Sequence, residues 1–310
     1  ELLSDILINS TFPEKELVRE KDVVIEEINS YKDSPSELIY DEFENQLFTN
    51  HPLGRNILGT IKSVRSLNRK MILEFINRTY TSDQLYISSV SNLSFDKVIH
   101  ILELYFGTAP ERKREYQRIP FTGYEPSHKK VNINSHQSHS LLGIPAYHLY
   151  TEKRIPFSLL NNIIGGPGLN TRLNIAIREK NGLAYSVESQ YMPMTDTGLF
   201  TIYIGSDHQT IDKAIALTYK ELKRIKEEKL GTLQMSRAKK QFFGQISLMN
   251  ESNQNEMLSM AKSGMYTNKI DTMKEIYQKI NAITASDLLE VANETFDENR
   301  LSSLIYTKNR

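Results

Sequence analysis

The sequence contains no cysteine among its 310 residues. This absence excludes a disulfide framework, a zinc site built from thiolates and a thiol nucleophile. A metal site in this chain would therefore need histidine and carboxylate ligands. Net charge is also absent, because 38 lysine and arginine residues balance 38 aspartate and glutamate residues. No overall field favours nucleic acid or an anionic membrane, so we expect neither as a partner.

Long apolar runs are missing as well. No stretch approaches the roughly 20 apolar residues needed to span a bilayer, and the opening residues ELLSDILINS lack a basic segment followed by a long apolar one. We therefore expect a protein of the cytoplasm. The first residue is not methionine, and the opening residues have the pattern of an amphipathic helix already under way. From this we expect further sequence upstream in the intact protein.

The length of the chain predicts two units, since a typical domain has roughly 150 residues. Residues 109–130 are rich in proline, charge and isolated aromatic side chains, which is typical of an extended linker. Helical periodicity dominates residues 1–108, with one strand expected at residues 85–90. Strands and helices, including a helix over residues 170–180, are expected in residues 131–310. This order predicts an α+β fold, a two-layer α/β sandwich that occurs as two repeats, the first of them incomplete.

A glutamate-rich helix is predicted over LVREKDVVIEEINSYKDSP. Glu20 and Glu27 lie seven residues apart and so project from one face, next to an apolar stripe that contains Val23 and Ile28. A carboxylate on the apolar side needs compensation, because burying an unpaired charge is costly. Metal ligation is one form of compensation. The alternative is a solvated helix face that contains all five glutamates from Glu14 to Glu27, as is usual for a run of charge.

Four short pieces follow one another from this helix onward and share a pattern with one known family. They are Glu-x-x-Val-x-x-Glu-Glu-Ile, Asp-x-Pro, His-Pro-Leu-Gly and Ile-x-Gly-Thr. Their residues are Glu20, Val23, Glu26, Glu27, Ile28, Asp33, Pro35, His51, Pro52, Leu53, Gly54, Ile57, Gly59 and Thr60. This succession resembles the pitrilysin/insulinase-type zinc metallopeptidases, which include proteins like the mitochondrial processing peptidase.

In that family, zinc is held by two histidines of an inverted His-x-x-Glu-His motif and by a distal glutamate on a later helix. The resemblance implies that Glu27 is the metal ligand. It also implies that Glu20 orients a ligand or the attacking water without binding the metal. Glu26 is the alternative ligand, since a shift of one residue would exchange the two roles. The heptad spacing to Glu20 favours Glu27.

The histidine motif of the family does not occur in this sequence. Catalytic zinc sites use three protein ligands, so a single carboxylate cannot hold zinc against water. We therefore expect zinc in the intact parent protein, no zinc bound to this chain and no hydrolysis by this chain alone. His136 and His139 are three residues apart. They make a weak metal pair, because that spacing between two expected strands points them to opposite faces.

Residues 161–187, NNIIGGPGLNTRLNIAIREKNGLAYSV, resemble the signature of the C-terminal half of the same family. The resemblance implies that Arg178 and Tyr185 hydrogen-bond the substrate backbone near the scissile carbonyl. The alternative is that Arg172 and Arg178 pair with Glu179 and neighbouring carboxylates, and that Tyr185 is a strand residue with its hydroxyl at the surface. Residues 165–168 do not form a phosphate loop, because no Lys-Ser/Thr follows and Pro167 removes an amide donor.

The leading hypothesis is that the chain is part of a zinc metalloendopeptidase that acts on a peptide or unfolded protein. The alternative from another class is a non-catalytic family member that serves as a partner subunit or scaffold. A helical adaptor without a site is the third possibility. A homodimer or a pair with a related subunit is expected by analogy with the family. The presence of both Glu20 and Glu27 favours an active parent, because these residues have little purpose without a metal.

Overall fold

The computed structural model of the protein describes residues 1–107, 109, 111, 113–115 and 117–308. The expected end of the first repeat at residue 108, linker residues 110, 112 and 116, and residues 309–310 of the expected second repeat lie outside them. The chain divides into two compact units, each built from three segments. Unit 1 comprises Glu1–Ser30, Leu58–Ile119 and Leu248–Ile270, and unit 2 comprises Tyr31–Ile57, Pro120–Ser247 and Asp271–Arg310. The expected linker over residues 109–130 stays a prediction.

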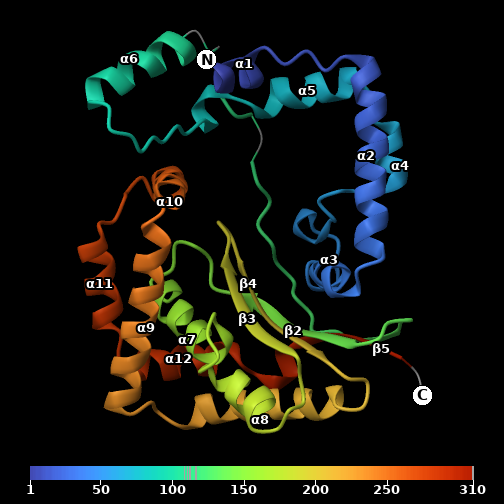
Figure 1. The fold of residues 1–310 in the computed structure, drawn as a ribbon, viewed down its shortest axis with the longest axis vertical. Coiled ribbons are helices and arrows are strands. Elements are labelled where there is room, and N and C mark those ends of the chain that lie inside the picture. The colour runs from blue at the N-terminus through green and yellow to red at the C-terminus, as the bar shows by residue number, and fades with distance from the viewer. Residues whose placement is uncertain (108, 110, 112, 116, 309–310) are drawn as a thin grey trace. The chain divides into compact units, whose positions relative to one another are not determined.

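Unit 2 is built around a five-stranded sheet with strand order β1-β5-β2-β4-β3 (Figure 1). The pair β1 and β5 is parallel, and the other pairs are antiparallel. The strands are β1 (His128–Asn132), β2 (Ser138–Ala146), β3 (Ser186–Pro193), β4 (Gly198–Ser206) and β5 (Ser302–Thr307). The helices are α3 (Pro35–Leu47), η1 (Pro52–Gly54), α7 (Arg154–Gly165), η3 (Asn174–Glu179), α8 (Ile211–Glu227), α9 (Thr232–Asn250, whose last residues belong to unit 1), α11 (Met273–Ala282), α12 (Ala285–Thr295) and η4 (Glu298–Arg300).

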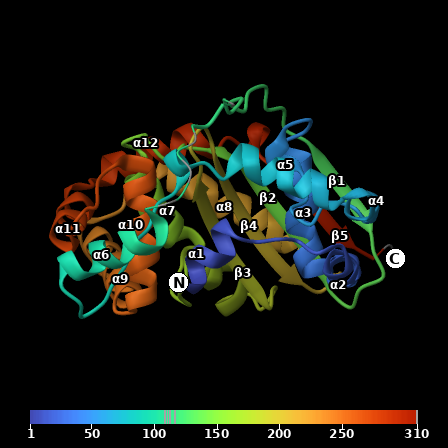
Figure 2. The same ribbon diagram turned by 90° about the horizontal axis from the view of Figure 1, so that it is seen from above.

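Both faces of this sheet are covered, α7 and α8 lying on one face and α3 on the other (Figures 1 and 2). Leu142 and Phe200 belong to the cluster under α7 and α8, whereas their neighbours Leu141 and Leu199 belong to the cluster under α3. This division follows from the alternation of side chains along a strand. Every residue of β4 is buried, as expected for a strand covered on both sides. The predicted α+β class is confirmed.

The aromatic ring of Phe157 joins the helices of unit 2 to the sheet. It makes edge-to-face contacts with Tyr191 of β3 and Phe200 of β4, at centroid distances of 4.7 and 5.5 Å. It also packs against Phe296, which directly follows α12, at 5.9 Å. Such ring pairs add to the free energy of burial, so this contact fixes α7 and α12 relative to the strands.

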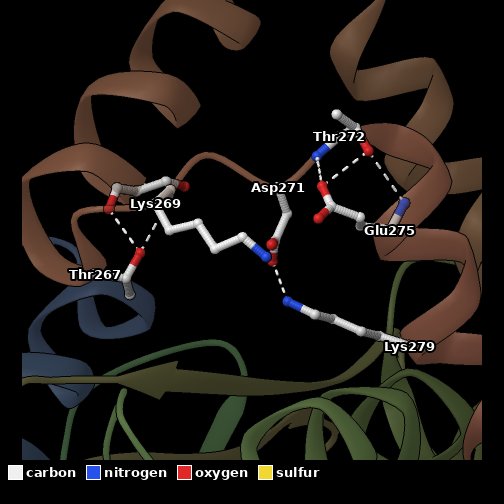
Figure 3. Close-up of polar contacts among 7 residues, drawn as sticks. Thr267, Lys269, Asp271, Thr272, Glu275 and Lys279 are labelled. Atoms are coloured by element: carbon white, nitrogen blue, oxygen red, sulfur yellow. Dashed lines mark hydrogen bonds and ion pairs between the residues drawn. The ribbon is translucent and has the colours of Figure 1, made fainter.

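A capping box starts α11 (Figure 3). The backbone N–H of Glu275 donates to the Thr272 hydroxyl at 3.2 Å, and the Thr272 N–H donates to the Glu275 carboxylate at 2.8 Å. Asp271 accepts a hydrogen bond from Lys279 beside it. The two bonds of the capping box satisfy donors that the first helical turn otherwise leaves unpaired, so the position at which α11 begins is encoded locally.

Within its described residues, unit 1 contains helices and no strand. The helices are α1 (Leu2–Ile8), α2 (Glu14–Lys32, whose last residues belong to unit 2), α4 (Ile61–Ser66), α5 (Arg69–Thr79), η2 (Ser82–Gln84), α6 (Phe95–Phe106) and α10 (Asn253–Thr267). Its buried core is small and consists of Ile25, Ile28 and Val64. The strand predicted at residues 85–90 is therefore wrong for this chain. A strand needs a partner for its backbone groups, and the described sheet does not include residues 85–90. This segment instead contacts α10, where the Ser88 hydroxyl donates to the carbonyl of Met257 at 2.7 Å.

The helices α5 and α6 leave their apolar sides uncovered in this structure. Neither helix has a buried residue. On α6, the side chains of Phe95 and Leu104 are 78% and 62% exposed. Apolar surface on this scale is typical of an interaction face, because monomeric proteins seldom leave large contiguous apolar patches in water.

A substitution at Gly143 of β2 can test the packing between α3 and the sheet. A methyl group at this position would lie 2.5 Å from the Phe200 carbonyl oxygen and 2.8 Å from Cε1 of Phe43. We expect Gly143→Ala to lower the free energy of unfolding by roughly 1–3 kcal/mol, measured by urea unfolding followed by circular dichroism. As a control, a methyl group at Gly244 inside α9 would have no atom within 4 Å apart from its own stretch of helix. Gly244→Ala should therefore raise the free energy of unfolding by about 0.5–1 kcal/mol. Equal midpoints for both variants would contradict this account.

Candidate functional site

The two predicted glutamates lie on one face of α2. Both Glu20 and Glu27 are exposed, and Val23 between them is also exposed. The residues that α2 buries are Ile25 and Ile28. Among the described residues, Glu27 has no hydrogen-bond or ion-pair partner. This exposure leaves the carboxylate accessible to a ligand and equally fits a solvated helix face, so the ligand role of Glu27 stays a prediction.

Glu20 borders a hollow of about 510 Å³ formed by α1, the loop after it and the first half of α2. The lining also includes Ile6, Val23 and Arg19. The Arg19 guanidinium is paired with Glu16 at 3.3 Å, and among the described residues it forms no ion pair with Glu20. The hollow leaves room beside Glu20 for an additional group or chain segment.

The described residues do not by themselves fit a zinc ion. They contain no group of three or more histidine, aspartate or glutamate side chains arranged to hold a metal. Glu27 offers one donor, whereas catalytic zinc requires three protein ligands. His139 is a core residue of β2 whose Nδ1 atom lies 2.8 Å from the Tyr203 hydroxyl, and burial lowers its pKa. His139 is therefore engaged in the core of unit 2, whereas His136 is exposed.

Arg178 lies in a helical segment that departs from the expected geometry. An α-helix is predicted over residues 170–180, but residues Asn174–Glu179 form a π-helical turn. The Lys180 N–H accordingly bonds to the carbonyl of Ile175, five residues back, at 3.0 Å. Such turns are rare and occur frequently at functional sites. The Arg178 side chain is exposed and makes no hydrogen bond or ion pair with any described residue. Of the expected alternative, the pairing of Arg178 with carboxylates is not observed among the described residues, whereas Arg172 does pair with a carboxylate, that of Glu221 at 3.1 Å.

A tight turn connects this segment to β3. Gly182 has φ +59°, a left-handed conformation that favours glycine. The N–H groups of Gly182 and Leu183 donate to the carbonyls of Arg178 and Ile177, at 2.9 and 3.0 Å. The Thr210 hydroxyl donates to the Leu183 carbonyl at 3.0 Å. These bonds fix the backbone between the arginine and the tyrosine of the predicted pair.

Tyr185 is exposed, with 56% of its surface accessible, and its phenol is oriented by a carboxylate. The hydroxyl donates a hydrogen bond to Oδ1 of Asp207 at 2.8 Å. This bond and the negative charge of Asp207 raise the pKa of Tyr185. The hydrogen bond therefore orients the phenol toward Asp207. The sequence gives no signal for Asp207 as a site residue, because nothing in the local pattern after β4 indicates its partner.

Amide side chains hold the glycine-rich turn that precedes this segment. The Gln245 amide donates to the Pro167 carbonyl at 2.7 Å and accepts from Asn162 at 2.6 Å. The buried Asn174 donates to the Val187 carbonyl at 3.2 Å. This network links α7, α9 and β3, so the turn is a rigid start for the segment that carries Arg178. These amides were also missed, since isolated asparagine and glutamine residues give no signal in a sequence.

The comparisons with solved structures define the class of this fold. The chain superimposes with a TM-score of 0.93 on the structure of a peptidase M16 inactive domain from Pseudomonas fluorescens, at 20% identity, over 100% of this chain and 74% of that one. A protease from Helicobacter pylori gives 0.82 at 18% identity, over 96% of this chain and 72% of that one. A chain from the Candida albicans complex III2 bound to Inz-5 also gives 0.82, at 15% identity over 99% of this chain and 75% of that one. These similarities establish the fold.

The sequence comparisons establish the family. Residues 66–242 match the model described as the peptidase M16 inactive domain, and residues 1–61 match the model of insulinase, peptidase family M16. A protein of Rickettsia bellii named as an uncharacterized zinc protease is 30% identical over 99% of this chain and 74% of its own length. The uncharacterized zinc protease YmxG of Bacillus subtilis is 30% identical over 98% of this chain and 74% of its own length. The chain belongs to peptidase family M16, the insulinase family, which confirms the resemblance that the two sequence motifs indicate.

None of the helices in the described part of the chain combines the length and the apolar character needed to cross a bilayer.

The contact between Tyr185 and Asp207 gives a direct test by titration. We expect Asp207→Asn to lower the pKa of Tyr185 toward the ordinary value, because the acceptor loses its negative charge. The measurement is a pH titration of protein labelled with ¹³C in tyrosine, with the Tyr185 resonance assigned by its loss in Tyr185→Phe. Asp212→Asn, an exposed aspartate of α8 paired with Lys130, should leave the titration unchanged. An unaltered Tyr185 pKa in Asp207→Asn would show that the hydrogen bond does not form.

Proposed function

We propose that this chain is part of a zinc-dependent metalloendopeptidase in which Arg178 and Tyr185 bind the backbone of a peptide substrate. The observation that carries the proposal is the geometry of the turn between them. A hydrogen-bonded turn presents on one side a guanidinium that has no ion pair among the described residues, and on the other a phenol oriented by Asp207. Both are hydrogen-bond donors of the kind that stabilise charge developing on a carbonyl oxygen.

The names of related proteins support the zinc and the peptide parts of this proposal. The relatives from Rickettsia bellii and Bacillus subtilis are both named as uncharacterized zinc proteases. In the intact protein, Glu27 would supply one zinc ligand, and the remaining ligands would come from a His-x-x-Glu-His motif outside this sequence. Glu20 would orient a ligand or the water. The chain alone is proposed to be inactive and to bind no zinc.

In the proposed organisation of the chain, residues 1–108 are the C-terminal part of a first repeat. Residues 109–130 are a linker, and residues 131–310 are the second repeat. We propose further that an additional segment covers unit 1 in the intact protein. The uncovered apolar sides of α5 and α6 and the hollow beside Glu20 support this proposal. Burial of such side chains contributes about 1.5–3 kcal/mol each, so a covering segment would stabilise this unit substantially.

A non-catalytic role is the alternative, in which the chain serves as the partner subunit of an active relative or as a scaffold. The match of residues 66–242 to a domain described as inactive favours it. A homodimer or a pair with a related subunit is compatible with either function. The two functions differ in zinc content and in cleavage, which the following experiments measure.

The metal ligand is tested in the protein expressed from its complete gene. We expect one zinc per chain, measured by atomic emission, and chelator-sensitive cleavage of a quenched fluorogenic peptide. Glu27→Gln should abolish zinc binding, because an amide is a poor ligand for this metal. Glu26→Gln, which removes the adjacent and equally exposed carboxylate, should retain zinc. Loss of zinc in Glu26→Gln instead would move the ligand role to Glu26. A complete protein without zinc or cleavage would favour the scaffold.

The substrate role of Tyr185 is tested in the same protein. Tyr185→Phe removes the donor and should lower kcat by roughly 10²–10³-fold with unchanged zinc content, since such donors act mainly on the transition state. Tyr150→Phe removes the hydroxyl of a similarly exposed tyrosine of unit 2 and should have little effect. Equal activity of the two variants would exclude Tyr185 from the reaction.

A further inference from the structure

Unit 2 contains a cavity that the proposed peptidase function does not use. Its volume is about 450 Å³, within the range of small-molecule sites. It is lined by the end of α7, by residues around Arg172, by the C-terminal end of α8 with the turn that follows, and by the first turns of α9. All of these segments belong to unit 2. We refer to it below as the basic cavity.

Four cationic side chains line the basic cavity: Arg172, Arg224, Lys229 and Arg237. Among the described lining residues, Glu228 is the one acidic side chain, and it pairs with Arg224 at 3.7 Å. Glu221, which is not part of the lining, pairs with Arg172 and Arg224. Four positive charges against two carboxylates leave an excess of two positive charges. The protein as a whole is neutral, so this excess is a local feature of the cavity.

Glu221 holds two of the guanidinium groups in place. One of its oxygen atoms accepts from Nε of Arg172 at 3.1 Å, and the other accepts from Nη1 of Arg224 at 3.0 Å. The side chains of Arg172 and Glu221 are only 19% and 11% exposed. Within the described residues, Arg172 hydrogen-bonds through Nε alone, so the two terminal nitrogens of its guanidinium remain available. An arginine fixed in this way loses little entropy when it binds a ligand.

The other two cations have no carboxylate partner in the described part of the chain. Arg237, in the second turn of α9, is exposed and makes no ion pair or side-chain hydrogen bond there. Lys229 donates only to the Ser286 hydroxyl, at 3.1 Å. The backbone dipole near the start of α9 also favours an anion at this end of the cavity.

We propose that the basic cavity binds a small phosphorylated molecule through Arg172, Arg224, Lys229 and Arg237. A phosphomonoester carries about −1.5 to −2 charges at neutral pH, which matches the excess of positive charge in the cavity, whereas a simple carboxylate carries half of it. Guanidinium groups bind phosphate oxygens through paired hydrogen bonds, and terminal nitrogens are available for them here. The cations gather in one cavity instead of along a stripe, which favours a small ligand over nucleic acid. The site is independent of the proposed peptidase function.

The test is isothermal titration calorimetry of the protein with inorganic phosphate and with glycerol 3-phosphate, and with acetate as a singly charged anion. We expect one site for each phosphate compound and weaker or no binding of acetate. Arg237→Gln should weaken phosphate binding by about tenfold. Lys240→Gln removes an exposed positive charge from the same helix outside the cavity and should leave affinity unchanged.

Folding of each variant is checked by its thermal midpoint. Lys229→Gln, at an exposed turn position, provides a second variant that should weaken phosphate binding without disturbing the pair of arginines on Glu221. Tighter binding of glycerol 3-phosphate than of phosphate would identify an ester, and the reverse would identify free phosphate, either of which supports the site. Three results would overturn it: no binding of either compound, equal binding of acetate, or an equal loss of affinity in Lys240→Gln.

Discussion

The carboxylate of Glu221 is the constraint on which the organisation of unit 2 around Arg178 depends. It lies on α8 and binds Arg172, which precedes the π-helical turn, through one oxygen and Arg224 through the other. A largely buried carboxylate is costly unless both oxygens are satisfied, and here each has a guanidinium partner. The ion pair therefore ties the segment that carries Arg178 to α8. It also positions two of the cations of the basic cavity.

The register of the sheet explains the position of Tyr185. Strands β3 and β4 are antiparallel neighbours, with Ser186 opposite Gly205. Tyr185 directly precedes β3 and Asp207 directly follows β4, so this register brings their side chains to the same end of the strand pair. A shift of one residue would place the tyrosine on the other face and break the contact. The packing of both faces of the sheet fixes that register, and with it the direction of the phenol.

The two units differ in how completely their apolar surface is covered. In unit 2, helices cover both faces of the sheet and bury most of its apolar side chains. In unit 1, helices with amphipathic sequences keep apolar side chains in water and bury only a small core. The glutamates proposed for zinc lie in unit 1, whereas the arginine and tyrosine proposed for substrate lie in unit 2. The unit that would need a further segment to complete a zinc site is thus also the one with uncovered apolar surface.

The sequence by itself determined the α+β class, most of the helices and strands, and the family, because periodicity, caps and short motifs are encoded between near neighbours. It also indicated Glu20, Glu27, Arg178 and Tyr185 as site residues. Only the tertiary structure decided the π-helical form of the Arg178 segment, the contact of Tyr185 with Asp207 and the basic cavity. The contact and the cavity join separate segments of the chain, so they depend on strand register and helix packing. The strand expected at residues 85–90 failed for the same reason, since its formation depends on a partner that local sequence does not specify.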